Sequence, residues 1–214
     1  MSKISAVILN YGMGNLYSVH QACIEVGIDS QISQDPKEIL NTDLLIIPGV
    51  GCFPQAMKNL KDLELLDVIA EFVRSGKHLL GVCLGAQLLF SHSEEFEKTA
   101  GLNLIKGSVN SFRKFSADKD LIVPHVGWNQ VLLSAYASDH WFSNVNQLYY
   151  FVHSFVMNPE DAQHIISYTD YCDVRFASVV SEDNCTGIQF HPEKSGREGL
   201  KIFESLRVRM LKAI

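Results

Sequence analysis

Three short apolar runs in the first half of this 214-residue chain constrain its fold more than any other feature. They lie at residues 5–9, 44–47 and 78–82, and each is followed by a segment whose apolar residues recur at helical spacing. A strand that is apolar without alternation is buried on both faces, which is typical of a parallel sheet covered by helices on both sides. The first half of the chain therefore predicts an α/β fold.

Local signals mark where several helices begin and end. Asp35 can cap a helix whose first position is Pro36 and whose third is Glu38. Gly76 is a suitable stop for the helix before residues 78–82. We expect further helices from residue 16, over 84–90, and near the C-terminus, where Leu200, Phe203, Leu206 and Met210 share one face.

The second half is richer in strands. We expect them at residues 126–133, 148–157, 164–168, 176–181 and 186–190, with a hairpin turn at 182–184. Together the two halves predict a mixed, mostly parallel central sheet flanked by helices, with an antiparallel, strand-rich portion. Because no repeat, linker or low-complexity tract interrupts the chain, we expect residues 1–214 to form a single domain.

Composition excludes several classes of function. The net charge of −6 argues against a nucleic-acid-binding protein, which needs clustered basic residues. The longest nearly unbroken apolar stretch, residues 79–90, is too short to cross a membrane, and the N-terminus lacks the pattern of a signal peptide. The five scattered cysteines and eight histidines show no metal-ligand spacing, so we expect no metal and no cofactor. These features predict a cytoplasmic enzyme.

Residues 81–85 carry the strongest chemical signal. Their sequence, Gly-Val-Cys-Leu-Gly, lies between a predicted strand and a predicted helix, which is the pattern of a nucleophile elbow with cysteine as the nucleophile. The tight turn leaves no room for a side chain on either glycine. It also places Cys83 at a helix N-terminus, which favours its thiolate. The alternative is that the two glycines serve packing alone and Cys83 is a core residue.

A second motif supplies the partners that a cysteine nucleophile requires. Residues 187–193 read Gly-Ile-Gln-Phe-His-Pro-Glu and end a predicted strand. His191 can exchange a proton with Cys83, and Glu193 is spaced to hold the other ring nitrogen of His191. On its own, a His-Pro-Glu segment is more often an ordinary surface feature. Paired with the elbow, it indicates a Cys83, His191 and Glu193 triad.

These two segments resemble the class I glutamine amidotransferases. The matching residues are Gly-Val-Cys-Leu-Gly-Ala-Gln at 81–87 and Gln-Phe-His-Pro-Glu-Lys-Ser at 189–195. The resemblance implies the α/β core of that family and the same catalytic triad. It also implies hydrolysis of glutamine to glutamate and ammonia through a thioester on Cys83.

Four further segments narrow the resemblance. Residues 11–16 (Tyr-Gly-Met-Gly-Asn-Leu), 48–53 (Pro-Gly-Val-Gly-Cys-Phe), 124–129 (Pro-His-Val-Gly-Trp-Asn) and 149–154 (Tyr-Tyr-Phe-Val-His-Ser) are similar to the glutaminase subunits of imidazole glycerol phosphate synthase. The matches run in order through nearly the whole chain. This similarity implies a heterodimer with the cyclase subunit of that synthase, which would use the ammonia in histidine biosynthesis.

Thioester chemistry builds negative charge on a carbonyl oxygen and therefore needs backbone N–H donors. The N–H of Leu84 follows the nucleophile, and the loop at residues 48–51 can supply a second donor from Val50 or Gly51. In the family this loop is thought to reorient when the synthase binds its own ligand. The resemblance therefore implies a gated glutaminase that is weak in isolation.

Candidate substrate contacts lie near the elbow and in a later strand. Gln87 is one helical turn beyond Cys83 and can meet the polar ends of the substrate. The segment His153, Ser154 and Phe155 resembles the strand that contacts substrate through its backbone in the family. We therefore give His153 a binding role at most.

Two segments have a less specific interpretation. Residues 12–14 do not extend to the Gly-x-Gly-x-x-Gly pattern of a dinucleotide loop because Tyr17 stands at the third glycine position. A turn at the partner face is the better interpretation. By itself, the segment 124–129 favours a structural loop with a packed Trp128, whereas the resemblance places it at the interface with the cyclase.

The chain departs from residues common in the family at Asn10, Ala86 and Phe155, none of which belongs to the triad. A related glutaminase supplying ammonia for amidino-sugar formation in surface-polysaccharide synthesis remains an alternative. Two others are a non-catalytic docking subunit, disfavoured because all three triad residues are present, and a cysteine hydrolase acting on peptides or small amides without a partner.

Overall fold

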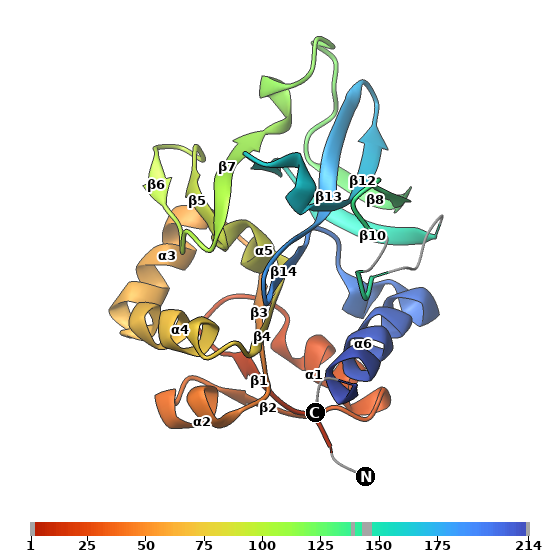
Figure 1. Cartoon of the computed structure of the whole chain (residues 1–214). Helices are drawn as coiled ribbons and strands as arrows, with labels where there is room; N and C mark the ends of the chain where they lie inside the picture. Colours follow the sequence, from red (N-terminus) through yellow and green to blue (C-terminus); the bar gives the residue numbers. More distant parts are fainter. Residues whose placement is uncertain (1–2, 138–139, 143–146, 213–214) are drawn as a thin grey trace.

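The computed structural model of the chain describes residues 3–137, 140–142 and 147–212 (Figure 1). The described helices are α1 (Leu16–Glu25), α2 (Pro36–Asn41), α3 (Phe53–Asp62), α4 (Leu65–Arg74), α5 (Leu84–Leu88) and α6 (Gly196–Leu211), with short 3-10 turns η1 (Phe112–Lys114), η2 (Ala162–His164) and η3 (Pro192–Lys194). The strands are β1 (Ser5–Leu9), β2 (Asp29–Ser33), β3 (Leu44–Gly49), β4 (His78–Cys83), β5 (Phe90–Ser93), β6 (Thr99–Ala100), β7 (Ile105–Ser111), β8 (His125–Gln130), β9 (Leu132–Leu133), β10 (Leu148–His153), β11 (Phe155–Pro159), β12 (Ile165–Tyr171), β13 (Val174–Glu182) and β14 (Cys185–Ile188).

The main sheet has the order β2-β1-β3-β4-β14-β13-β11-β7-β5-β6 among the described strands. The five strands from β2 to β14 are all parallel to one another. The next strand in the order, β13, is antiparallel to β14. Strand β12 pairs with β13, and β8 and β10 form a separate antiparallel pair. This confirms the predicted α/β fold with a mixed sheet, parallel in its first half and mostly antiparallel beyond β14, where only β5 and β7 pair in parallel among the described strands.

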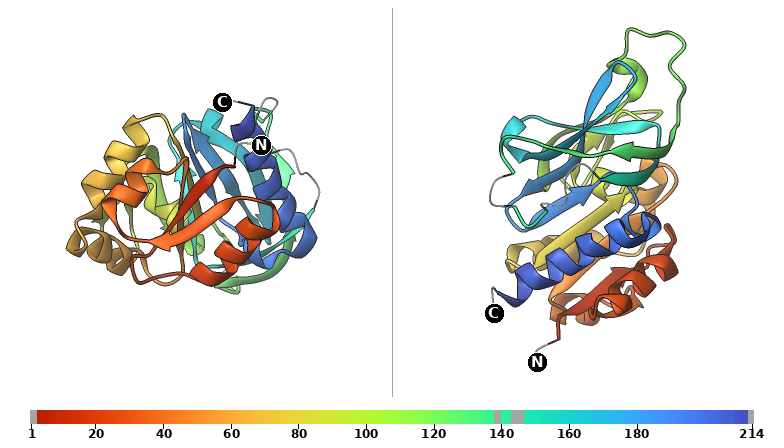
Figure 2. Two further views of the ribbon diagram at one scale, coloured as in Figure 1. Left: turned by 90° about the horizontal axis from the view of Figure 1, so that it is seen from below. Right: turned by 90° about the vertical axis from the view of Figure 1, so that its right-hand side faces the viewer.

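Helices cover both faces of the parallel part (Figure 2). Side chains of α1 and α6 pack on one face with Ala6 and Ile8 of β1, whereas α2, α3 and α4 pack on the other with Val7 and Leu9. Alternate residues of one strand thus enter two different cores, so each position must be apolar. This is the physical reason for the continuous apolar runs in the sequence.

Several local predictions are confirmed. Asp35 caps α2 by accepting a hydrogen bond from the Lys37 N–H, and Pro36 occupies the first turn. The turn between β13 and β14 consists of Asp183 and Asn184, with Asp183 in the left-handed region at a φ of 50°. Its tight connection is typical of a two-residue hairpin.

Three predicted elements were wrong in extent. The helix expected over 84–90 ends at Leu88, and Phe90 begins β5, which pairs in parallel with β7. The strand expected over 126–133 divides into β8 and β9, and the one over 148–157 divides at Ser154. After Ser154 the chain leaves β8 and joins β7, so β10 and β11 belong to different sheets. An apolar run shows burial, but it does not show which strand will be the neighbour.

Strand β2, helix α3 and strands β5 to β7 were not predicted from the sequence. Strand β2 shows little alternation of polar and apolar residues, and four of its five residues are polar. It lies at the edge of the main sheet, where polar side chains can remain in contact with water. In the ranges that the structure describes, no helix is both long and apolar enough to cross a membrane.

Candidate active site

Cys83 lies at the carboxyl end of β4, where the chain turns abruptly into α5. Its φ of 54° and ψ of −109° fall in a region that residues with side chains rarely adopt. The side chain is 5% exposed, and its Sγ lies 3.9 Å from the carbonyl oxygen of Val152 on β10. The structure therefore has the sharp strand-to-helix bend that residues 81–85 predict.

Glycines make this bend possible because neighbouring backbones touch. A Cβ on Gly85 would lie 1.7 Å from the carbonyl oxygen of Ile47 on β3. A Cβ on Gly81 would lie 2.6 Å from the carbonyl oxygen of Gly85 itself. The start of α5 is thus pressed against β3 and β4, and this contact sets the position of Cys83.

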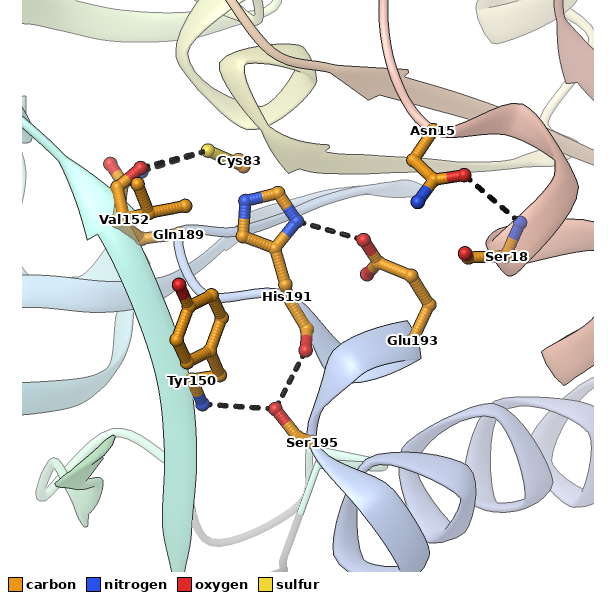
Figure 3. Close-up of polar contacts among 9 residues, drawn as sticks. All are labelled: Asn15, Ser18, Cys83, Tyr150, Val152, Gln189, His191, Glu193 and Ser195. Atoms are coloured by element: carbon orange, nitrogen blue, oxygen red, sulfur yellow. Dashed lines mark hydrogen bonds and ion pairs between the residues drawn. The ribbon is translucent and has the colours of Figure 1, made fainter. Parts of the chain in front are cut away.

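His191 and Glu193 come from the end of β14, the strand beside β4. The Nδ1–H of His191 donates to Oε1 of Glu193 at 2.8 Å, and both side chains are only 2% exposed. This bond places the proton on Nδ1 and leaves Nε2 on the side of the ring that faces Cys83 (Figure 3). Two segments more than 100 residues apart therefore meet at one point.

Ser195 holds the backbone of His191 against β10. Its hydroxyl donates to the His191 carbonyl at 2.6 Å and accepts the Tyr150 N–H at 3.0 Å. The His191 N–H in turn donates to the Tyr150 carbonyl at 2.9 Å. The three contacts, of which Figure 3 shows the two made by Ser195, lock the short segment after β14 onto β10, so the imidazole has little freedom to move.

Electrostatics favour the protonated form of His191. Burial acts to lower its pKa, but contacts with Cys83 and Glu193 outweigh burial and raise the pKa from 6.5 to about 10. Because the pKa of His191 is higher in the folded state than in the unfolded state, protonation of His191 stabilises the folded protein. This stabilisation is fully present below pH 6.5 and is lost as pH rises through the folded value.

The expected result is a pH-dependent difference in the free energy of unfolding between the wild type and His191→Gln. The difference should shrink steadily from pH 6.5 to about pH 10, because only the wild type loses this proton. Urea unfolding at intervals across that range measures it. A difference that stays constant would show that His191 is not held as an imidazolium.

A cavity of about 310 Å³ is lined in part by Cys83. Its walls come from the elbow, the loop after β3, the segment after β5 and the junction of β10 and β11. The lining residues are Val50, Gly51, Cys83, Leu84, Gln87, Glu95, Pro124, Val152, His153, Ser154 and Phe155. The structure thus brings every predicted oxyanion and substrate residue to one cavity, which has room for a molecule the size of an amino acid.

The loop that carries Val50 and Gly51 is supported from below by the segment after β1. The hydroxyl of the buried Tyr11 donates to the Pro48 carbonyl at 2.7 Å. Gly51 has a φ of 118°, which glycine adopts readily, and a Cβ there would lie 2.5 Å from Met13. Residues 11–14 therefore shape the cavity wall, a role that sequence reasoning did not predict.

Comparison with known proteins identifies the family. The family model described as Glutamine amidotransferase class-I matches residues 7–208. The chain belongs to the class I glutamine amidotransferases.

Two curated relatives of this amidotransferase cover nearly its full length. The imidazole glycerol phosphate synthase subunit HisH of Methanosarcina barkeri is 46% identical, over 93% of this chain and 96% of its own. The subunit of the same name from Lactococcus lactis is 43% identical, over 96% of this chain and 98% of its own. Among solved structures, PurLQS from Thermotoga maritima aligns with a TM-score of 0.72 at 19% identity, over 98% of this chain and 100% of the other, which supports the fold.

Gln87 of the amidotransferase can offer its oxygen to a ligand. The Nε2 group donates to the Phe155 carbonyl and to Oε1 of Gln189, both at 3.0 Å. Both N–H bonds are therefore used inside the protein, and Oε1 is the atom available to the cavity. Gln87 can thus accept a hydrogen bond from a bound molecule but not donate one.

The ring of His153 does not point to a ligand. Its Nδ1–H donates to the Phe155 carbonyl at 2.8 Å, and its Nε2 accepts from Nδ1 of His125 at 3.1 Å. Burial lowers the pKa of His153 to about 3 and that of His125 to about 4, so both rings are neutral. His153 can therefore meet a ligand only through its backbone, and its ring shapes the wall of the cavity.

Glu95 is a functional candidate that sequence reasoning missed. It follows β5 and lines the cavity, and its Oε2 accepts the Phe53 N–H at 2.7 Å. Burial raises the pKa of its carboxyl group. The only signal in the sequence is one acidic residue in a polar stretch, Ser-Glu-Glu-Phe-Glu at 93–97, and nothing there distinguishes it from Glu94.

No group of three or more potential metal ligands lies together within the part of the chain that the structure describes. The donor set at the site consists of one thiol, one imidazole and carboxylates that already accept hydrogen bonds. This set of groups is suited to acyl transfer through a cysteine.

Proposed function

We propose that this chain is the glutaminase subunit of an imidazole glycerol phosphate synthase, with residues 1–214 acting as one amidotransferase domain. The observation that carries the proposal is the meeting of Cys83 and the buried His191–Glu193 pair beside a cavity of amino-acid size. Relatives named as HisH subunits, at 43% and 46% identity over nearly the full length, support the choice of synthase.

In the first half of the reaction, the Cys83 sulfur attacks the side-chain amide carbon of glutamine. The thiol proton has already moved to Nε2 of His191, whose raised pKa favours this state, and the imidazolium donates it to the departing nitrogen as the C–N bond breaks. Ammonia leaves, and a γ-glutamyl thioester remains on Cys83. Glu193 keeps the imidazole oriented and stabilises its charge throughout.

In the second half, a water molecule gives a proton to His191 and attacks the thioester carbon. The C–S bond breaks, glutamate leaves, and the thiolate of Cys83 is restored. Negative charge develops on the carbonyl oxygen in both halves. The Leu84 N–H and a backbone N–H from Val50 or Gly51 on the facing loop would stabilise this negative charge by donating hydrogen bonds to the oxygen.

The ammonium group of glutamine has matching partners in the cavity. The carboxylate of Glu95 and the free Oε1 of Gln87 are both acceptors, and a substrate ammonium group can donate to both. Backbone groups of Ser154 and Phe155 line the same wall. This arrangement would place the side-chain amide of the substrate at Cys83.

Replacing Glu95 with glutamine is expected to raise the KM for glutamine by roughly ten- to a hundredfold, because a charged hydrogen bond is lost. The kcat should change much less. Steady-state assays of glutamate release measure both constants. Glu94→Gln is a matched control because Glu94 is exposed and pairs with Lys114 outside the cavity. Equal effects of the two variants would exclude an ammonium-binding role.

The outer face of the β8–β10 pair is a candidate docking surface for the cyclase subunit. Val126, Trp128 and Leu148 are each 55% exposed there, and Trp128 lies opposite Tyr150 in the register. The packed Trp128 favoured by sequence alone is therefore wrong. Because Pro124 and Val152 of the same region line the cavity, a subunit docked on this face would lie next to the source of ammonia.

The test is glutamate release from glutamine by the purified chain, measured with and without the cyclase subunit of a HisH-containing synthase. We expect release that increases when the cyclase is added. Trp128→Asp should lose this increase, whereas Val208→Asp, at another exposed apolar position on α6, should keep it. Absence of glutamate release under both conditions would refute the proposal. Cleavage of other amides without a partner would instead support a general cysteine hydrolase.

A further inference from the structure

Gln189 connects the nucleophile to the wall of the cavity. It follows β14 directly, is fully buried, and belongs to neither the triad nor the cavity lining. Its Oε1 accepts from Nε2 of Gln87 at 3.0 Å, and its own Nε2 lies 3.9 Å from the Sγ of Cys83 (Figure 3). One buried amide therefore contacts both the sulfur of Cys83 and the side chain of Gln87, whose oxygen is available to the cavity.

The orientation of this amide follows from its neighbours. The Phe155 carbonyl can only accept, so the group of Gln87 that approaches it must be the NH2. The second hydrogen of the same NH2 then points to Gln189, whose nearer atom must be its oxygen. The NH2 of Gln189 is left on the opposite side, toward Cys83. A carbonyl two residues beyond β10 thus determines which end of Gln189 faces the sulfur.

The sulfur has two fixed polar neighbours with opposite preferences. The Val152 carbonyl can only accept, so it suits the thiol form, which donates. The N–H of Gln189 can only donate, so it suits the thiolate form, which accepts. The site therefore has a hydrogen-bond partner for Cys83 both before and after the proton moves to His191.

We propose that Gln189 is a positioning residue for the glutaminase reaction, stabilising the thiolate of Cys83 with its N–H and holding the Oε1 of Gln87 toward the substrate with its oxygen. This inference rests on the proposed function. It predicts that the two ends of one amide affect two different kinetic constants, which a merely structural residue would not do.

Two variants separate the two ends. Gln189→Met has similar length but loses both hydrogen bonds, whereas Gln189→Glu keeps an acceptor for Gln87 and loses the donor to the sulfur. Ser178→Ala is the control: Ser178 is equally buried on the adjacent β13 and its hydroxyl bonds Ser167, while its carbonyl, which accepts the Gln189 N–H at 2.9 Å, is kept in alanine. Circular dichroism establishes that each variant is folded.

The first measurement is the rate of Cys83 alkylation by iodoacetamide as a function of pH, resolved by mass spectrometry of the Cys83 peptide. The titratable side chains around the sulfur include Tyr11, His153, His191 with Glu193, and Glu95 across the cavity; all are kept in the variants, and Gln189→Glu adds one carboxylate beside the sulfur. We expect the pH of half-maximal alkylation to rise by about one unit in Gln189→Met, to rise further in Gln189→Glu because the added carboxylate repels the thiolate, and to stay unchanged in Ser178→Ala.

The second measurement is the kinetics of glutamate release. We expect kcat to fall at least about tenfold in both Gln189 variants. The KM should rise clearly only in Gln189→Met, which releases Gln87. Folded variants with wild-type alkylation profiles and wild-type constants would overturn the inference. Because alkylation does not use glutamine, an inactive wild type would refute the proposed function while alkylation still tests the contact with the sulfur.

Discussion

The Cys83→Ala variant is expected to release no glutamate above background, a loss of at least about 10⁴-fold in kcat. Alanine has no atom that can form the thioester, and Cys83 is the only thiol that lines the cavity among the residues that the structure describes. The variant should remain folded because alanine keeps the Cβ and adds no atom to the crowded elbow. Glutamine binding should persist, since Glu95 and Gln87 are unchanged.

Glutamate release and calorimetric titration with glutamine measure the two properties separately. Cys185→Ala is the matched control, because Cys185 is 2% exposed on β14 of the same sheet but lies outside the cavity. It should retain activity near the wild-type level. Substantial glutamate release by Cys83→Ala, or an equal loss in Cys185→Ala, would show that the reaction does not pass through Cys83.

The second large effect is expected from Gly85→Ala, which should lower the free energy of unfolding by at least about 3 kcal/mol. Alanine favours helices in general, but here its Cβ would lie 1.7 Å from the Ile47 carbonyl oxygen and 2.7 Å from its carbon. Neither backbone atom can move without separating α5 from β3. Relief of the clash must therefore displace Cys83 as well as destabilise the fold.

Urea unfolding of the wild type, Gly85→Ala and Gly187→Ala provides a graded comparison. A Cβ on Gly187 meets Val180 Cγ2 at 3.0 Å and Ala86 Cβ at 3.1 Å, so side-chain shifts of a few tenths of an ångström can accommodate it. We expect a cost of about 1 kcal/mol for this variant. If Gly85→Ala unfolds at the same urea concentration as Gly187→Ala, the close approach of α5 to β3 is not what shapes the elbow.

Much of the site could be predicted from sequence because its spacing rules are local. A tight bend requires glycines beside Cys83, and a histidine held by a carboxylate two residues later forms a compact pair. Glu95 could not be predicted in this way. It reaches the cavity only because β5 pairs with β7 and brings the end of β5 beside the start of α3, where the Phe53 N–H meets it.

Gln189 and the β10–β11 junction show the same limit. The contacts of Gln189 span 102 residues to Gln87 and 106 to Cys83, and no local pattern records them. The run at 148–157 is mostly apolar and was predicted as one strand, yet the chain passes at Ser154 from one sheet to another. Trp128 is a large aromatic residue of the kind often found in a core, but it lies on an outer strand face and is 55% exposed.

The sequence by itself determined the parallel α/β half, the elbow at Cys83 and the pairing of His191 with Glu193. These depend on strand and helix periods and on the steric needs of glycine, which act over a few residues. Only the tertiary structure decided which strands are neighbours, which acid enters the cavity and which amide faces the sulfur. Strand pairing and burial arise from contacts between distant segments, so the same local pattern is compatible with several arrangements until the whole sheet is assembled.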